Sequence, residues 1–97
     1  MSGRMTIDPE QVEVIGGRII SKAGEARSVV GQIDNEITNV QSEWQGQSAQ
    51  EFVQEFKQLK PKFDKMVECA ETIGLNLKKV AHIKRNADND IRAQIKG

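Results

Sequence analysis

The sequence predicts an all-α fold, an antiparallel helix-turn-helix hairpin that dimerises into a four-helix bundle. Apolar residues recur every three or four positions on both sides of the middle of the chain, and Gly46 interrupts the pattern there. The chain has only 97 residues, with three Phe, one Trp and no Tyr. So little apolar material makes a marginal monomeric core, which favours burial against a second subunit.

The first helix is expected at about residues 8–42. Asp8 can cap it, Pro9 suits the first helical position, and Glu10 lies at the positive end of the helix dipole. The apolar positions that follow are close to a heptad repeat. They are Val12, Ile15, Ile19, Ala23, Ala26, Val30, Ile33, Ile37, Val40 and Trp44.

A tight turn is expected at about residues 43–47. Gly46 can supply the positive φ that other residues resist, and so short a link makes the helices antiparallel. Trp44 then lies at the closed end, where its ring is expected to wedge between the two helices. Ser48 and Glu51 are spaced as a capping box for the second helix.

The second helix is expected at about residues 48–90, followed by a flexible C-terminal tail. Pro61 lies inside its apolar stripe and removes one backbone hydrogen bond, which predicts a bend near residues 57–61. The stripe continues past the proline, so the whole chain is interpreted as one helical-hairpin domain, residues 1–97. The stripe consists of Ala49, Phe52, Phe56, Leu59, Phe63, Met66, Ala70, Ile73, Leu77, Val80, Ala87 and Ile91.

Two faces are candidates for helix packing or dimerisation. Glycines spaced by seven fall on one helix face, where they would let another helix approach closely; the alternative is that this face is simply solvated. A second row of apolar residues makes each stripe wider than a two-helix seam requires, which supports a symmetric homodimer. The residues assigned to packing or dimer contacts are Gly17, Gly24, Gly31, Ile33, Ile37, Phe52 and Phe56.

The two halves of the chain carry opposite charge. Residues 1–46 have seven acidic and four basic residues, whereas residues 47–97 have seven acidic and ten basic ones. Antiparallel packing of the halves is therefore electrostatically favourable, although exposed pairs contribute little each.

Residues suited to catalysis or metal binding do not form a recognisable set. One cysteine, Cys69, cannot form an internal disulfide, and one histidine, His82, makes no convincing zinc site with it. We expect Cys69 to be a partly buried structural thiol; a disulfide across a dimer or a redox role is the alternative. Glu51 and Glu55 share a helical face but are interpreted as solvated charges. No enzyme activity, cofactor or metal is expected.

Charge and hydropathy limit the partners. The formal net charge is zero and the pI is about 6.6, which does not favour nucleic acid. A basic cluster in the second helix could contact anionic lipid or nucleic acid, but acidic residues follow at once and a solvated face is the better interpretation. Its members are Lys78, Lys79, Lys84 and Arg85.

The N-terminus shows no secretory signal, and no run is apolar enough to span a membrane. On the residues alone, the expected location is the cytosol.

The tripeptide Trp44-Gln45-Gly46 lies near the middle of a chain of about 100 residues, between two amphipathic helices. In this setting the sequence resembles the WXG100 family, the ESAT-6-like small substrates of ESX, or type VII, secretion systems. The likeness covers the whole chain and is greatest to the homodimeric Firmicutes branch. It includes the start at residues 7–11, the segment after the turn and the end at residues 88–97.

The resemblance implies export of a folded homodimer by a dedicated membrane ATPase, without a cleavable signal peptide, and so a secreted or cell-surface location. It implies that Trp44 and Gly46 form a surface read by the secretion machinery, together with the C-terminal segment of the partner subunit. In that segment Asp88, Ile91 and Ile95 match the family's pattern, whereas Lys84 stands where the family has a hydrophobic residue or Tyr.

Three functions follow as hypotheses. The first is a secreted homodimer that serves as a virulence-type effector or secretion co-factor, with cosecreted proteins as possible partners. The second is a targeting partner that forms a heterocomplex with a larger secreted toxin. The third is a membrane-active effector, against which the mean hydropathy of −0.55 counts.

Overall fold

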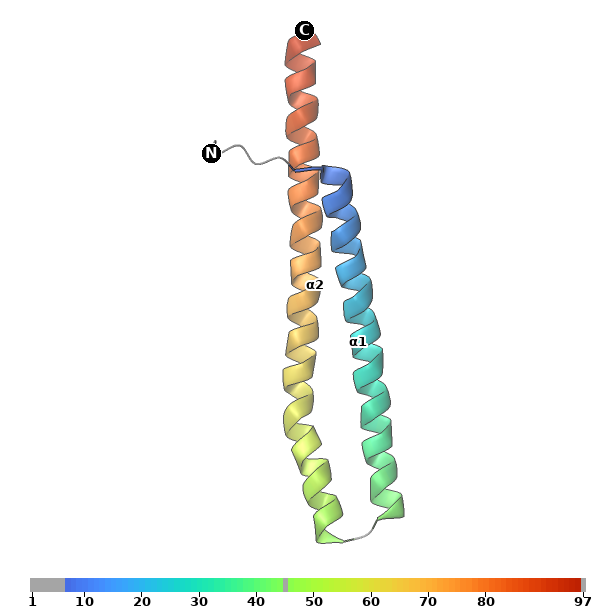
Figure 1. Ribbon diagram of the computed structural model, residues 1–97. Coiled ribbons are helices and arrows are strands. Elements are labelled where there is room, and N and C mark those ends of the chain that lie inside the picture. Colours follow the sequence, from blue (N-terminus) through green and yellow to red (C-terminus); the bar gives the residue numbers. More distant parts are fainter. Residues whose placement is uncertain (1–6, 45, 97) are drawn as a thin grey trace, which may run out of the picture.

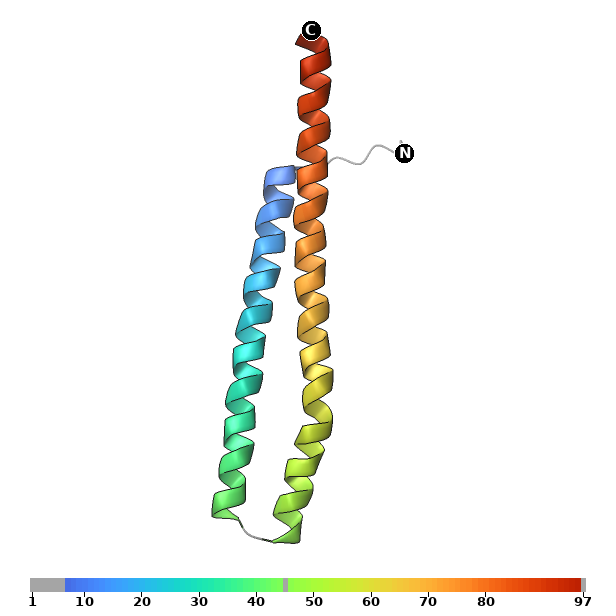
Figure 2. The same ribbon diagram turned by 180° about the vertical axis from the view of Figure 1, so that it is seen from behind.

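The protein is a hairpin of two long helices, as the sequence predicts (Figures 1 and 2). A computed structural model describes residues 7–44 and 46–96. Helix α1 spans Pro9–Glu43 and helix α2 spans Gln47–Lys96. Packed side by side, they form a rod of 76 × 25 × 16 Å. Residues 1–6 and Gly97, which the expected domain includes, lie outside the described residues.

The start of α1 is fixed by its cap. Asp8 has an extended backbone, and its Oδ1 accepts from the backbone N–H of Glu10 at 3.0 Å and of Gln11 at 3.4 Å. These bonds satisfy donors that the first turn of a helix leaves free. The predicted cap is therefore confirmed, with Pro9 as the first helical residue.

The turn depends on Gly46, which has a φ of +141°. This conformation is open to glycine and strained for other residues, so the predicted role of Gly46 is confirmed. The backbone N–H of Gln50 donates to the Gly46 carbonyl at 3.3 Å, and α2 begins at Gln47. Ser48 is thus the second residue of the helix, and the predicted capping box is wrong because the glycine carbonyl starts the helix earlier. Gln45, also expected in the turn, lies outside the described residues.

Helix α2 continues without a break through Pro61. In Figure 1 its axis changes direction where the ribbon passes from green to yellow, just before that residue, as a proline kink requires. The expected helix end near Asp90 is placed too early, because α2 is helical to Lys96. Residues 75–96 contain neither glycine nor proline that would stop it. The end of α2 therefore projects beyond the start of α1 (Figure 1).

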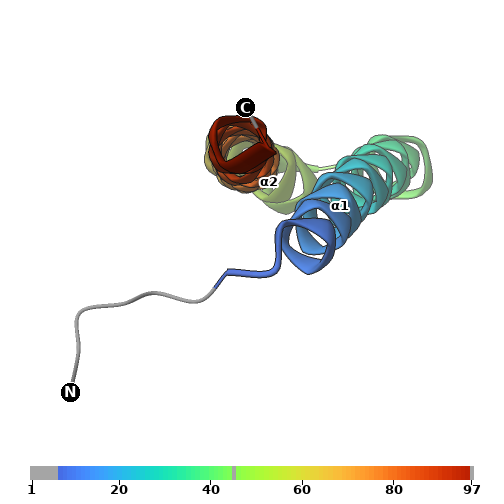
Figure 3. The same cartoon turned by 90° about the horizontal axis from the view of Figure 1, so that it is seen from above.

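The core is a narrow seam between the helices. Gly16 and Gly74 mark a close approach, where a Cβ placed on either glycine would lie 2.7 Å from the carbonyl oxygen of the other. Viewed along the rod, the two helices form a single layer (Figure 3). Each helix is thus covered on one side only. The buried apolar side chains are Ala23, Ala49, Val53, Phe56, Val67 and Ala81.

Candidate interaction and recognition surfaces

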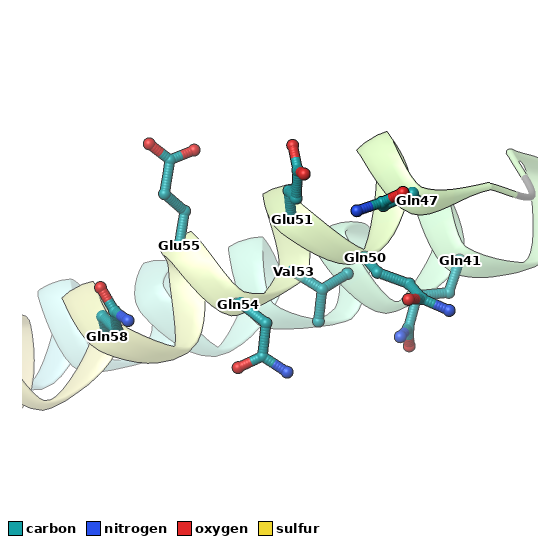
Figure 4. A pocket seen from close by; sticks show the side chains of 8 residues that line it. All are labelled: Gln41, Gln47, Gln50, Glu51, Val53, Gln54, Glu55 and Gln58. Atoms are coloured by element: carbon teal, nitrogen blue, oxygen red, sulfur yellow. The ribbon is translucent and has the colours of Figure 1, made fainter.

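The carboxylates Glu51 and Glu55 border an open hollow of about 550 Å³ near the closed end. Both project to the same side of α2, as predicted, while Gln54 points away from them (Figure 4). The other lining side chains are mainly glutamine amides around Val53. Among the described residues, no group of three His, Cys, Asp or Glu side chains could hold a metal ion. The polar groups that line the hollow are therefore glutamine amides and two carboxylates.

An apolar groove of about 390 Å³ runs between the helices at mid-length. It joins a second hollow along α2, because Met66 and Ala70 line both. Met66 is 67% exposed and Ile73 54% exposed, which is unusual for such large apolar side chains. We call this surface the apolar face. It comprises Ile15, Ile19 and Ala26 of α1 with Met66, Ala70 and Ile73 of α2.

The aromatic residues at the closed end lie on the surface. Trp44 is 45% exposed and Phe52 54% exposed, and their ring centroids are 5.9 Å apart at an interplanar angle of 57°. The expectation that Trp44 wedges between the helices is therefore wrong. Its extended backbone ends α1, and the small Ala49 fills the buried position beside the turn. The exposed rings leave an apolar surface at this end of the rod.

The predicted glycine face does not pack inside the hairpin. A Cβ placed at Gly24 or Gly31 would meet none of the described atoms within 4 Å, and one at Gly17 would meet only the Lys78 side chain at 3.8 Å. Gly16 and Gly74, which no sequence pattern singled out, do bring the helices together. The sequence shows only that Gly16 and Gly17 are adjacent, and it does not indicate which of them faces the other helix.

The four large residues predicted for packing divide into two pairs. Phe56 is buried in the seam and Ile37 is half-buried. Ile33 is 42% exposed and, like Phe52, remains available to another molecule.

The predicted recognition residues of the C-terminal segment lie along the end of α2. We call residues 89–96, which extend beyond the last half-buried position of α2, the C-terminal arm. Ile91 and Ile95 are 54% and 79% exposed on it. Asp88 lies at its base, where the Nζ of Lys84 approaches Asp88 Oδ1 to 2.9 Å. Lys84, which departs from the family pattern, thus forms an ion pair with Asp88, which matches it.

Ion pairs join the helices on the seam. The two Nη atoms of Arg27 each donate to one carboxylate oxygen of Glu71 at 2.8 Å. This hydrogen bond is the main cause that lowers the pKa of Glu71 and raises that of Arg27. Nearer the open end, Arg85 contacts Glu13 at 3.3 Å, and that hydrogen bond is the main cause that raises the Arg85 pKa. The Arg85 contacts follow the charge difference between the two halves of the chain, whereas the Arg27–Glu71 pair joins a base of the first half to an acid of the second.

The basic cluster and the single cysteine also differ from expectation. Arg85 and Lys84 are half-buried and paired with acids, so this part of the cluster is not a freely solvated face. Cys69 is exposed and lines the hollow next to Met66, which corrects the expectation of a partly buried thiol. His82 is exposed, as expected for a surface residue.

The part of the chain that the structure describes contains no helix long and apolar enough to cross a membrane.

Comparison with known proteins places the hairpin in a family. A family model, WXG100, described as proteins of 100 residues with WXG, matches residues 4–89. The chain is 28% identical to YukE of Bacillus subtilis over 97 residues, which is the full length of both proteins. It is 26% identical to an ESAT-6-like protein of Streptococcus agalactiae over 94 residues, covering 97% of this chain and 98% of that protein.

Solved structures agree with this relationship. EsxA of Geobacillus thermodenitrificans superposes with a TM-score of 0.85 at 26% identity, covering 93% of this chain and all of that one. A secreted protein of Bacillus anthracis, EsxB, superposes with a TM-score of 0.79 at 31% identity, covering 90% of this chain and 99% of that one.

Proposed function

Because this chain belongs to the WXG100 family, we propose that it is a small, non-enzymatic substrate of a type VII secretion system, exported as a folded helical homodimer. The observation that carries the proposal is the apolar face. A hairpin that leaves Met66 and Ile73 more than half exposed has an unburied stripe along one side. Placing the same stripe of a second copy against it makes a four-helix bundle with a self-complementary interface.

The charge distribution favours a head-to-tail pair. Residues 28–56, around the closed end, contain five acidic residues and no basic one. Residues 78–96, at the opposite end of α2, contain six basic and two acidic residues, so that end of the helix is basic. Opposite orientation of the two copies brings the acidic closed end of one towards the more basic half of the other, whereas parallel packing superposes the two acidic ends.

A head-to-tail pair also creates a shared recognition surface. Trp44 and Gly46 at the closed end of one copy then lie towards the arm of the other, with Ile91 and Ile95 exposed on it. Exposed apolar anchors with charged neighbours suit recognition by another protein. We propose that the secretion ATPase binds this composite surface, and that the exported dimer acts outside the cell or at its surface as an effector or secretion co-factor. The likeness to a protein described as secreted supports this location.

Solution mass with a matched pair of variants tests the dimer. Met66 and Leu75 are nine residues apart, which places them on opposite sides of α2, and they are 67% and 58% exposed. We expect a light-scattering mass of about twice 10.8 kDa for the wild-type chain. Met66→Lys should give a monomer, because it buries an unpaired charge in the interface, and Leu75→Lys should remain a dimer.

One result would reject the proposed interface, and another would reject the homodimer itself. One is a mass that Met66→Lys and Leu75→Lys change equally, which would place the interface elsewhere. The other is a poorly helical wild-type monomer that becomes ordered only with another protein. That result would support the heterocomplex with a larger secreted toxin, which would use the same apolar face.

Export is tested separately in the producing bacterium. We expect the protein in the culture supernatant or at the cell surface when the type VII membrane ATPase is present, and retention in the cells when the ATPase gene is deleted. Unchanged export after the deletion would refute the proposed route.

A further inference from the structure

We propose that Arg85 is a positioning residue, which clamps the start of α1 to α2 and thereby holds the C-terminal arm as an ordered helix for recognition. The inference rests on the proposed function for its last step. It starts from one guanidinium that contacts two acids. Nη2 of Arg85 lies 3.0 Å from Oε1 of Glu10 and 3.3 Å from Oε1 of Glu13. These acids are one turn apart on α1, so one side chain holds the first two turns of that helix.

The position of Arg85 on α2 gives the contact its effect. Ala81, one turn earlier, is fully buried in the seam. Asp88, three residues later, is the last half-buried residue, and the side chains of residues 89–95 are all exposed. The Arg85 clamp therefore lies at the border between the two-helix rod and the single-helix arm. Helix α1 gives the arm no cover beyond it.

Arg85 is partly buried at the seam. Its side chain is only 32% exposed, and its Nε is buried without a hydrogen-bond partner among the described residues. A guanidinium that has lost this much water depends on its remaining contacts, and the two carboxylates supply them. Removing the two acids should therefore release the Arg85 side chain from the seam, and replacing the arginine should leave the start of α1 without this contact.

Release of the clamp should reach the arm. An isolated helical segment of eight residues is unstable in water, so the arm is helical because it continues from the packed part of α2. Ile91 and Ile95 are neighbours only while that helix persists, because residues four apart lie close together on a helix and far apart on an extended chain. Fraying at the clamp would thus scatter the apolar pair that the recognition surface needs.

Hydrogen exchange on the intact dimer tests the clamp. We expect Arg85→Gln to speed amide exchange in residues 86–95 by about threefold or more, the factor that corresponds to losing a partly buried ion pair. The matched control is Arg27→Gln, which removes another ion pair between the helices, that of Arg27 with Glu71. These two residues are 44 positions apart in the sequence, and their pair lies far from the arm. It should leave exchange in the arm unchanged. Exchanging the charges, with Arg85→Glu combined with Glu10→Arg and Glu13→Arg, should restore protection.

Export and mass complete the test. We expect Arg85→Gln to remain a dimer by light scattering and to reach the supernatant in at least about threefold smaller amount than Arg27→Gln, in line with the loss of arm order. Equal arm exchange in the two variants would overturn the clamp. A loosened arm with normal export would overturn its role in recognition. If the wild-type protein were not exported at all, the proposed function and the export step would both fail, and the exchange data alone would decide the clamp.

Discussion

The close approach of Gly16 and Gly74 allows a quantitative comparison of two alanine substitutions in α1. Gly16→Ala would place a Cβ 2.7 Å from the Gly74 carbonyl oxygen, and 3.2 Å and 3.3 Å from side-chain atoms of Lys78 and Leu77. Gly24→Ala would place the same atom where none of the described atoms lies within 4 Å. Both substitutions remove a glycine from the interior of the same helix, so they share the gain of about 1 kcal/mol in helix propensity.

The difference between the variants therefore isolates the steric cost. The Gly74 carbonyl would have to retreat by about 0.7 Å to reach an ordinary contact of 3.4 Å. Since the obstacle is backbone, α2 must move with it, and overpacking of this kind costs about 1–3 kcal/mol. We expect Gly24→Ala to be more stable than wild type by about 1 kcal/mol, and Gly16→Ala to be less stable than Gly24→Ala by about 1–3 kcal/mol.

Urea unfolding followed by circular dichroism measures these differences at one fixed protomer concentration, because the stability of a dimer depends on concentration. In thermal unfolding, 1 kcal/mol corresponds to about 4–8 °C for a domain of this size. Equal stability of the two alanine variants would refute the reasoning, since it would mean that the helices do not approach closely at Gly16.

Two further predictions concern the surface contacts. Trp44→Ala should lower the free energy of unfolding, measured in urea, by only about 1 kcal/mol, because the ring contributes only its exposed pair with Phe52. An export assay should nevertheless show loss of export. A loss of stability of about 3–5 kcal/mol would mean that the ring is buried. Arg27→Gln should raise the pKa of Glu71 to its ordinary value in an NMR titration. Arg27 lowers the pKa of Glu71 in the folded state, so the pair stabilises the wild type at pH values above the ordinary glutamate pKa of about 4.3. The stability advantage of the wild type over Arg27→Gln should disappear as the pH falls through the folded-state pKa of Glu71. An advantage that grew with acid would contradict this assignment.

Several features could be predicted from local sequence because they depend on local physics. The cap at Asp8 needs only the backbone of the next three residues, and Gly46 adopts a φ that other residues resist. The helices themselves follow from apolar spacing. The predicted end of α2 near residue 90 is too early, because a polar segment does not fray merely by being polar and residues 75–96 contain neither glycine nor proline.

Contacts between the helices depended on rotation and register, which no local pattern supplies. Three glycines at heptad spacing predicted a packing face, yet Gly16, one position away from Gly17, meets Gly74 instead. A rotation of about 100° per residue decides which of two adjacent glycines faces the seam, and only the packing of both helices fixes it.

The sequence by itself determined the helices, the turn and the family, since periodicity, one glycine and the W-x-G tripeptide are all local in the chain. Only the tertiary structure decided what each stripe covers. Among the described residues, Ala23, Ala49 and Ala81 make up half of the buried apolar side chains of the seam, beside Val53, Phe56 and Val67, whereas Met66 and the Trp44 ring remain outside it. The physical reason is that two helices in close contact leave room for small side chains between them. Many of the bulkier apolar groups that a sequence assigns to a core then lie on the surface, where they can contact another molecule.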